Sequence, residues 1–393
     1  MVLLQENDKG MKVCMITSLH SPQDDRVFFK EALSLKSNGF DVSILCLADE
    51  NGFLKDMSGN LLNEKNQQSI IIDGINIFGI KKQSTLFQKL LHKIGQGKCW
   101  DVFIKTAIDI DAEVYHAHEP QTAFIGLKIQ KQTNAKLIYD AHEPWIFSRS
   151  IKEWVLKKLC LKKLKNIITA NAITQQTLLK ENPNINIAVI FNCSPSFFSQ
   201  YRKENSEIII CHEGALLFNR GLKMIMEALI ILKETHPNFK FKIIGDVFGK
   251  EKKYLRSKIT ANNLEENIEI TGWLPYKNVP NAIAECSIGL ICNTDEKRNT
   301  LAGPPNKLFN YMTMGLATIT VDLPATTSIL QKAKCGILLQ KRDARHLSSS
   351  ITKLLDDQDT LRTYQQSALQ TADESYNWQS EAEQLFQFYK CLK

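Results

Sequence analysis

The strongest constraint on the fold of this chain is the repeated alternation of short apolar runs with longer amphipathic stretches. The apolar run 11–17 is followed by a helical pattern over 26–38, which ends at Gly39, and then by a second apolar run at 41–47. Together these segments form one strand–helix–strand unit of about 35 residues, the building block of a parallel sheet covered by helices. The alternation continues along the chain, so we predict an α/β protein with doubly wound sheets.

Further segments of both kinds fill the rest of the chain. Apolar runs predict strands at 75–80, 114–120, 136–143, 166–170, 187–192, 207–214, 241–246, 268–274, 287–293, 316–322 and 336–340. Helical patterns lie at 86–107, from about 150, and at 222–235, 251–262, 278–285 and 305–314. The polar, proline-containing segment 192–207 interrupts the alternation, and 393 residues exceed what one hydrophobic core organises. We therefore predict two domains, 1–197 and 198–375.

Composition narrows the function classes. The formal net charge of +7 suits an anionic small ligand or an anionic membrane surface and is too weak to imply nucleic acid. The ten cysteines form no C-x-x-C pair, which indicates reduced thiols and a cytoplasmic protein. There is no apolar run long enough for a membrane span. Neither G-x-G-x-x-G nor G-x-x-x-x-G-K-[ST] follows a first strand, which argues against a nicotinamide dehydrogenase and a P-loop nucleotidase.

Histidine–glutamate pairs follow two predicted strands. His116, His118 and Glu119 come directly after one apolar run, and His142 and Glu143 follow the next. Because the carboxyl ends of parallel strands meet at one edge of a sheet, we expect these side chains to share a site. Lone histidines in such places often only bond to the backbone, but the repeated pair favours a functional role. The spacing differs from H-E-x-x-H on a helix, and we predict no metal.

The loop after the first strand is a second candidate. Asp24, Asp25 and Arg26 open the next predicted helix. Acidic residues at a helix N-terminus are ordinary capping chemistry. The position over the sheet edge also makes Asp25 and Arg26 candidates for substrate contact.

Two stretches of the second domain favour anion binding. Gly214 permits close backbone approach, and Arg220 stands just before a helix, where a cation opposes the helix dipole. Pro305 fixes the entry to the helix 305–314, and Lys307 lies in its first turn. The alternative for that helix is plain packing through Leu308 and its neighbours. Cations and free backbone N–H groups together indicate a phosphate site.

The ordered motifs resemble the family 4 glycosyltransferases (glycosyl transferases group 1), which have the GT-B fold of two Rossmann-like doubly wound domains facing a central cleft. The resemblance covers nearly the whole chain. It rests on MITSLHSPQDDRVFFKEALSL, VYHAHEPQTA, KLIYDAHE, HEGALLFNRGL, ITGWLP, PPNKLFNYMTMGLATI and the closing YNW.

The resemblance implies transfer of a hexosyl or N-acetylhexosaminyl group from a nucleoside-diphosphate sugar to a saccharide or lipid-linked acceptor in surface polysaccharide biosynthesis. It implies retention at the anomeric carbon, no cofactor and no essential metal. His118 matches the histidine near the transferred sugar, with Asp25, Arg26, Glu119, His142 and Glu143 on the acceptor side. The matching donor residues are Gly214, Arg220, Gly272, Trp273, Leu274, Pro305, Asn306, Lys307 and Asn310. The last helix, within 376–393, is expected to rejoin the first domain.

The chain departs from the family's pattern at important positions. The paired glutamates of the family fall at Ala302 and Asn310, and Ala215 stands where an arginine is usual. A scaffold or binding subunit with weakened catalysis is therefore the alternative function. A sugar-nucleotide epimerase is a third, because it shares the fold, but it needs more carboxylates than the sequence offers.

A basic stretch indicates a further partner. Lysines alternate with Trp154 and several leucines, which suits either a solvated helix face or docking on an anionic membrane at the inner face of the cell membrane. The lysines are Lys152, Lys157, Lys158, Lys162, Lys163 and Lys165.

Overall fold

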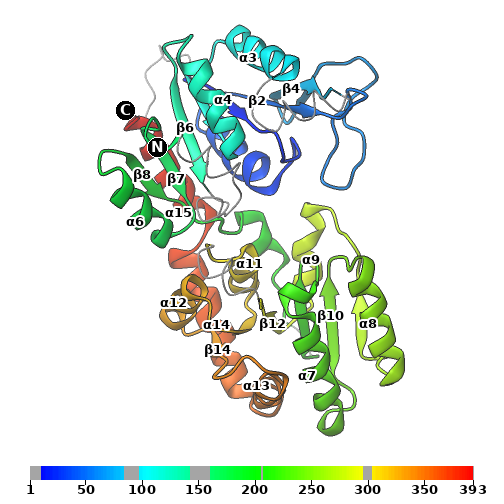
Figure 1. Ribbon diagram of the computed structural model, residues 1–393. Helices are drawn as coiled ribbons and strands as arrows, with labels where there is room; N and C mark the ends of the chain where they lie inside the picture. The colour runs from blue at the N-terminus through cyan, green and yellow to red at the C-terminus, as the bar shows by residue number, and fades with distance from the viewer. Residues whose placement is uncertain (1–9, 84–96, 142–159, 205–206, 295–302, 393) are drawn as a thin grey trace. The chain divides into compact units, whose positions relative to one another are not determined.

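The computed structural model describes residues 10–83, 97–141, 160–204, 207–294 and 303–392. The chain divides into two compact units (Figure 1). The N-terminal unit contains Met1–Ile190 and Ala382–Lys393, and the C-terminal unit contains Phe191–Glu381.

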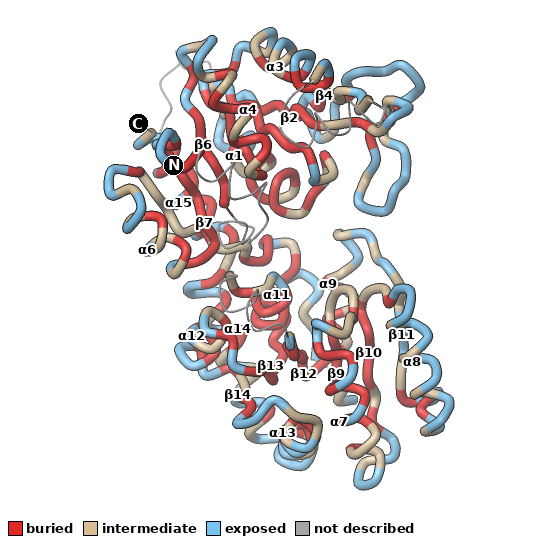
Figure 2. Tube along the Cα trace, in the orientation of Figure 1, coloured by how far each residue is buried: buried red, intermediate tan, exposed pale blue. Residues whose placement is uncertain are grey.

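The N-terminal unit is built on an eight-stranded sheet with the order β3-β4-β2-β1-β5-β6-β7-β8. All neighbouring pairs are parallel except β3 with β4. The strands are β1 (Lys12–Ile16), β2 (Asp41–Ala48), β3 (Ser69–Ile72), β4 (Ile75–Lys81), β5 (Val114–Ala117), β6 (Lys136–Ala141), β7 (Asn166–Thr169) and β8 (Asn186–Val189). The central strands β1, β5, β6 and β7 are almost entirely buried, because helices cover both faces of a parallel sheet. Figure 2 shows this burial for the labelled strands β6 and β7.

The order of these strands fixes where ligands can bind. Strand β2 pairs with β1 on one side, and β5, which comes later in the chain, pairs with β1 on the other. The gap between β1 and β5 is therefore a topological switch point, and open α/β sheets bind ligands beyond the carboxyl ends of the strands there. The loop from Thr17 to Asp24 and the residues from His118 onward leave the sheet at this point.

Helices connect these strands. They are η1 (Asp25–Ala32), α1 (Leu33–Ser37), α3 (Lys98–Ile110), α4 (Pro120–Gln130), α6 (Ala172–Glu181) and the C-terminal α15 (Trp378–Lys390). The first of them, η1, is a π-helix capped by the Asp24 side chain, which accepts hydrogen bonds from the backbone N–H groups of Arg26 and Val27. It buries three charged residues, namely Arg26, Lys30 and Glu31. Mid-chain π turns often occur at functional sites.

The C-terminal unit has a six-stranded, all-parallel sheet with the order β11-β10-β9-β12-β13-β14. Its strands are β9 (Ile209–Glu213), β10 (Lys240–Ile244), β11 (Ile268–Ile270), β12 (Ile288–Ile291), β13 (Ala317–Thr320) and β14 (Gly336–Leu338). The switch point lies between β9 and β12. Its helices are η3 (Ser196–Tyr201), η4 (Phe218–Arg220), α7 (Leu222–Thr235), α8 (Gly249–Ala261), η5 (Tyr276–Asn278), α9 (Val279–Ala284), α11 (Asn306–Met314), α12 (Pro324–Ala333), α13 (Ala344–Asp356) and α14 (Gln358–Ser375).

The α/β doubly wound architecture predicted from the alternation is confirmed. The antiparallel strand β3 was not predicted, because its four residues pair locally with β4 and leave only Ile70 buried. Strand β5 is shorter than its apolar run and ends at Ala117.

The boundaries between the units differ from the predicted 1–197, 198–375 and 376–393. The C-terminal unit already begins at Phe191, since Phe191 and Cys193 pack in its core. It extends to Glu381. Tyr376 also belongs to that core. Only the later part of α15 returns to the N-terminal unit, where Phe386 and Tyr389 contact Phe40.

Some predicted features lie outside the described residues. They are His142, Glu143, Ala302, and Lys152, Lys157 and Lys158 of the basic stretch. In the described remainder of that stretch, Leu161 and Leu164 are buried while Lys162, Lys163 and Lys165 are exposed. Among the helices that the structure describes, none has the length and hydropathy needed to cross a bilayer.

Candidate functional site

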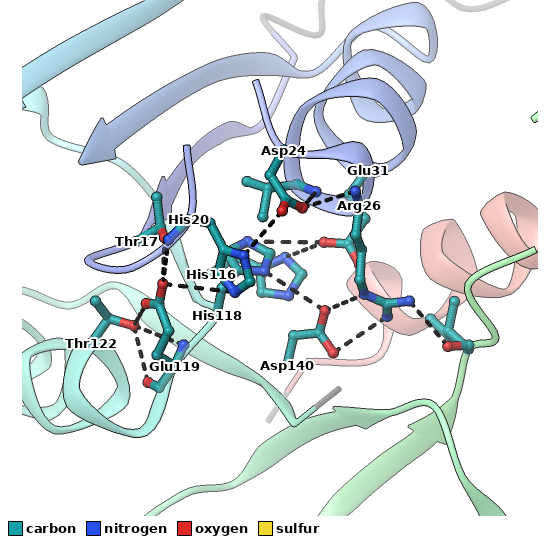
Figure 3. A network of polar contacts seen from close by, with 12 residues as sticks. Thr17, His20, Asp24, Arg26, Glu31, His116, His118, Glu119, Thr122 and Asp140 are labelled. Atoms are coloured by element: carbon teal, nitrogen blue, oxygen red, sulfur yellow. Dashed lines mark hydrogen bonds and ion pairs between the residues drawn. The ribbon is translucent and has the colours of Figure 1, made fainter. Parts of the chain in front are cut away.

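A buried polar cluster lies at the switch point of the N-terminal sheet (Figure 3). Arg26 binds Asp140 with two hydrogen bonds, Nε to Oδ2 at 2.6 Å and Nη2 to Oδ1 at 3.3 Å. The same Nε lies 3.0 Å from Oε1 of Glu31, so one guanidinium faces two carboxyl groups from η1 and β6. Bidentate arginine–carboxylate pairs are strong and geometrically specific, so this pair holds the π-helix against the end of β6.

Two imidazoles complete this cluster. The rings of His116 and His118 stack with centroids 4.6 Å apart. His118 places Nε2 3.9 Å from Oε2 of Glu31 and Nδ1 3.7 Å from Oδ2 of Asp140, which is electrostatic contact beyond hydrogen-bond length. Nδ1 of His116 is 2.9 Å from the hydroxyl of Tyr389, which α15 contributes from the far end of the chain.

Burial controls the protonation of the cluster. Desolvation raises the pKa of Glu31 well above its usual value, although Arg26 acts in the opposite direction, and nearby Asp140 raises it further. A raised pKa favours a neutral Glu31, so the main charges that remain close together are those of Arg26 and Asp140.

The cluster contains side chains that can act as metal ligands. Within the described ranges, Glu31, His116, His118 and Asp140 form the one group whose potential ligand atoms lie close together, all within 4.8 Å of one another. However, Arg26 already supplies a positive charge to both carboxyl groups at bonding distance. A divalent ion beside a guanidinium is electrostatically unfavourable, and this repulsion is an argument against a metal at this position.

Glu119 lies at the start of α4 and binds the loop that follows β1. Its carboxylate is buried and accepts hydrogen bonds from the backbone N–H groups of Ser18, Leu19 and His20, at 2.9 to 3.3 Å. The hydroxyls of Thr17 and Thr122 also donate to it, at 2.5 and 2.8 Å. Because this carboxylate clamps the loop after β1, the geometry favours a positioning role over direct contact with an acceptor.

The other N-terminal candidates are placed as follows. His118 is 1% exposed and Arg26 is 1% exposed, so both face the interior rather than the surface. Asp25 is half-buried on η1, 3.9 Å from the ammonium group of Lys30. His20, which the sequence did not single out, bridges the loop by placing Nδ1 3.0 Å from Asp24.

The C-terminal unit gathers a second polar group where β9 meets the first turns of α11. Nζ of Lys307 lies 3.1 Å from Nε2 of His212, in the interior. Burial lowers the pKa of Lys307 to about 8, with Glu213 opposing the shift and Arg220 adding to it. Burial, and then the charges of Lys307 and Arg220, lower the pKa of His212 well below its usual value. The imidazole is therefore neutral and accepts a hydrogen bond from the lysine.

Asn310 lies one helical turn beyond Lys307 and is also buried. Its Nδ2 donates to Oε1 of Glu213 at 2.8 Å, and its Oδ1 accepts from the hydroxyl of Ser194 at 2.6 Å. The hydroxyl of Tyr311 accepts from the backbone N–H of Glu213 at 2.8 Å. Three residues of α11 thus fasten the end of β9.

Glycines shape the backbone around this group. Gly214 adopts φ +84° directly after β9, and a Cβ at Gly245 would approach the Gly214 carbonyl to 2.7 Å. Gly221 has φ +94°, and a Cβ there would come 2.3 Å from the carbonyl oxygen of Cys292. Close backbone approach is thus built into both turns. Arg220 is exposed beside them and donates to the carbonyl of Ala215 at 3.2 Å.

The remaining predicted donor residues lie on the surface of this unit. Asn306 is exposed and Pro305 half-buried at the start of α11. Gly272 has φ +71°, Leu274 packs against the core, and Trp273 leaves 41% of its surface exposed.

Sequence reasoning did not single out several members of these groups. His212 and Glu213 repeat, after an apolar run, the H-E pair that drew attention to 118–119, so the signal was present. Glu31, Asp140, Ser194 and Tyr389 carried no such signal, because only the fold brings them next to their partners.

A known protein family matches most of the C-terminal unit. Residues 194–371 match the model of the family described as glycosyl transferases group 1. Over these residues, which make up somewhat less than half of the chain, the protein is similar to that family.

Curated relatives are similar to this chain at low identity. A putative colanic acid biosynthesis glycosyltransferase, WcaL of Salmonella typhimurium, is 25% identical over 167 residues, which is 42% of this chain and 41% of the relative. The amylovoran biosynthesis glycosyltransferase AmsK of Erwinia amylovora is 24% identical over 34% of this chain and 33% of its own length. The matches therefore span well under half of these relatives.

Solved structures match nearly the whole length of this chain. HepE of Anabaena, solved with UDP and glucose, superposes with a TM-score of 0.75 at 15% identity and covers 97% of this chain and 100% of its own. Sucrose-phosphate synthase of Thermosynechococcus elongatus gives a TM-score of 0.72 at 14% identity, covering 97% and 98%. With two parallel doubly wound units, the chain has the GT-B fold.

Proposed function

We propose that this protein is a glycosyltransferase that moves a sugar from a nucleoside-diphosphate sugar to a saccharide or lipid-linked acceptor in surface polysaccharide biosynthesis. The observation that carries the proposal is the cationic group of Lys307 and Arg220 at the carboxyl end of β9, within the residues that match the group 1 family. Two similar proteins, WcaL and AmsK, are named as glycosyltransferases of polysaccharide biosynthesis, and HepE was solved with UDP and glucose, which supports a nucleoside-diphosphate donor and a polysaccharide product.

In this proposal the C-terminal unit stabilises the leaving group. Departure of a nucleoside diphosphate builds negative charge on its outer phosphate, and preorganised cations lower the energy of that state. Lys307 and Arg220 supply these cations, and the positive-φ turns at Gly214 and Gly221 allow the backbone to approach. A hexosyl or N-acetylhexosaminyl transfer with retention, as in family 4, needs no metal or cofactor in this scheme.

The experiment is donor turnover. The protein is incubated with UDP-, GDP-, ADP- and dTDP-sugars, with and without EDTA, and release of nucleoside diphosphate is measured. We expect release from one donor class, unchanged by EDTA, with at least a tenfold loss in Lys307→Met and none in the exposed control Lys252→Met. No binding or turnover of any donor would contradict the proposal, and NMR of the product would give the anomeric configuration.

His118 is proposed as the residue near the transferred sugar. Its replacement by alanine removes an imidazole held between Glu31 and Asp140, while the donor cations lie in the other unit. We expect His118→Ala to lower kcat by one to two orders of magnitude with donor affinity unchanged, as for loss of a positioned catalytic group. Donor Kd by calorimetry and kcat by turnover separate the two effects. Unchanged kcat would remove His118 from the mechanism.

A scaffold or binding subunit with weakened catalysis is the second candidate. The observation in its favour is that Asn310 is an amide and is already bonded on both sides, by Ser194 and Glu213. Donor binding without turnover, with turnover restored only by a partner protein, would favour this candidate.

Association with an anionic membrane, proposed from the basic stretch 152–165, is tested by sedimentation with vesicles that contain or lack anionic lipid.

A further inference from the structure

Glu213 occupies a distinctive place in the C-terminal unit. It is the last residue of β9, which pairs with β10 on one side and with β12 on the other. Its side chain therefore stands at the switch point between β9 and β12, where doubly wound sheets bind their ligands. Neither the family match nor the sequence motifs assign a role to this carboxylate.

The structure fixes the position of this carboxylate with a bonded chain of side chains. Asn310 must direct its Nδ2 toward Glu213, because a carboxylate can only accept, and Oε1 receives this bond at 2.8 Å. The other end of the amide accepts from Ser194 at 2.6 Å, so Asn310 cannot rotate without losing one bond. Tyr311 also holds the backbone N–H of Glu213 at 2.8 Å.

The cations near Glu213 and the carboxylate of Glu213 itself attract different atoms of a ligand. Lys307 and Arg220 attract phosphate oxygens, whereas a carboxylate repels them and binds hydroxyl or N–H donors. In a nucleoside diphosphate such donors are the ribose hydroxyls and some base atoms. Ribose is favoured because it is joined directly to the diphosphate that Lys307 and Arg220 would bind, and Glu213 lies close enough to Lys307 to interact with its charge.

Resting on the proposed function, we infer that Glu213 binds the ribose hydroxyls of the nucleoside diphosphate and that Asn310 is a positioning residue. A carboxylate accepts several hydrogen bonds, so the bond from Asn310 orients the group and leaves it able to take a ribose hydroxyl. Asn310 then acts on the donor only through Glu213, and the residue that contacts ribose lies at the end of β9.

The test compares ribose with its 2′,3′-dideoxy form. Binding of UDP, GDP, ADP and CDP is measured by calorimetry, and the tightest binder is paired with its 2′,3′-dideoxy analogue. We expect the wild-type protein to prefer the ribose form by about ten- to a hundredfold, the range of hydrogen bonds to a charged group. In Glu213→Gln the ribose form weakens by a similar factor while the dideoxy form is unchanged, so the preference falls toward one.

Controls separate binding from folding. Glu265→Gln changes an exposed carboxylate of the same unit and should retain the wild-type preference. Asn310→Ala should lower the preference for ribose without abolishing affinity for the dideoxy form, as expected when Glu213 loses its orientation. Melting curves verify that each variant is folded.

Several results would overturn the inference. Equal weakening of both nucleotides in Glu213→Gln would indicate a structural role or a contact with the base. A wild-type protein that binds the diphosphate without preferring ribose would contradict this inference alone. A wild-type protein that binds no nucleoside diphosphate would contradict the proposed function, and the inference with it.

Discussion

Lys307 has an unusual environment for a phosphate-binding lysine. It is enclosed in the C-terminal unit beside a neutral His212, near Glu213 and Arg220. Burial lowers its pKa to about 8, so the free protein loses this positive charge in mildly alkaline solution and not in strong alkali.

This pKa predicts how donor binding depends on pH. Lysine is charged below its pKa, and a diphosphate binds the charged form better, so affinity should fall as pH rises from 7 to 9. We expect calorimetric Kd for the preferred nucleoside diphosphate to rise by up to about tenfold over this range. Lys307→Met should bind more weakly and with little dependence on pH, whereas Lys252→Met should follow the wild type. A flat wild-type profile would contradict this role.

Glu31 predicts a pH dependence of stability. Its pKa in the folded protein is raised by burial, so the folded state holds a proton that the unfolded chain releases. The contribution of Glu31 to stability is therefore complete below its unfolded pKa and is lost as pH rises through the folded value. We expect Tm of the wild type to decline with rising pH relative to Glu31→Gln, which mimics the protonated acid. Glu64→Gln, at an exposed site, serves as the control. Parallel curves for Glu31→Gln and the wild type would contradict a raised pKa.

At the scale of elements, the loop after β1 depends on one buried carboxylate. Five groups donate to Glu119, from residues 17–20 and Thr122. Thr122 also donates to the backbone carbonyl of Glu119 and accepts from its N–H, which completes the start of α4. The clamp connects the two segments that leave the sheet at its switch point.

Removing the charge of Glu119 should loosen this loop. Glu119→Gln replaces one acceptor oxygen by an NH₂ group that faces N–H donors, and we expect a loss of about 2 kcal/mol in the free energy of unfolding. Hydrogen exchange of the amides of residues 18–20 should accelerate more than that of β1. Glu64→Gln should leave both measurements unchanged. Wild-type exchange in Glu119→Gln would show that the carboxylate is dispensable.

At the scale of the whole molecule, the C-terminal helix completes the N-terminal unit. The later part of α15 buries Leu385, Phe386, Phe388 and Tyr389, and Tyr389 bonds His116. Each buried side chain of this size contributes about 1.5–3 kcal/mol, so together they are comparable with the stability of a domain.

Truncation tests this dependence. A chain that ends at Glu381 should lose the cooperative melting of the N-terminal unit, with rapid hydrogen exchange in β1 and β5. Tyr389→Phe keeps the packing and removes one hydroxyl, so it should cost only about 1 kcal/mol. Native protection of β1 in the truncated chain would contradict an essential role for α15.

The local pattern of the sequence determined the succession of strands and helices, because the period of apolar residues reports which face of an element is buried. It also located His118, Arg220 and Lys307, since strand ends and helix starts are visible as changes in that pattern. The same alternation predicted the edge of the sheet at which these residues lie, because parallel strands have their carboxyl ends at one edge.

Only the tertiary structure decided the partners of these residues. Asp140 meets Arg26 across 114 residues, Glu213 meets Asn310 across 97, and His116 meets Tyr389 across 273. Such pairs depend on strand order and on the path of the last helix, which local periodicity does not encode. Local pattern thus determined where the polar groups would emerge, and long-range packing decided which of them are buried, charged and held together.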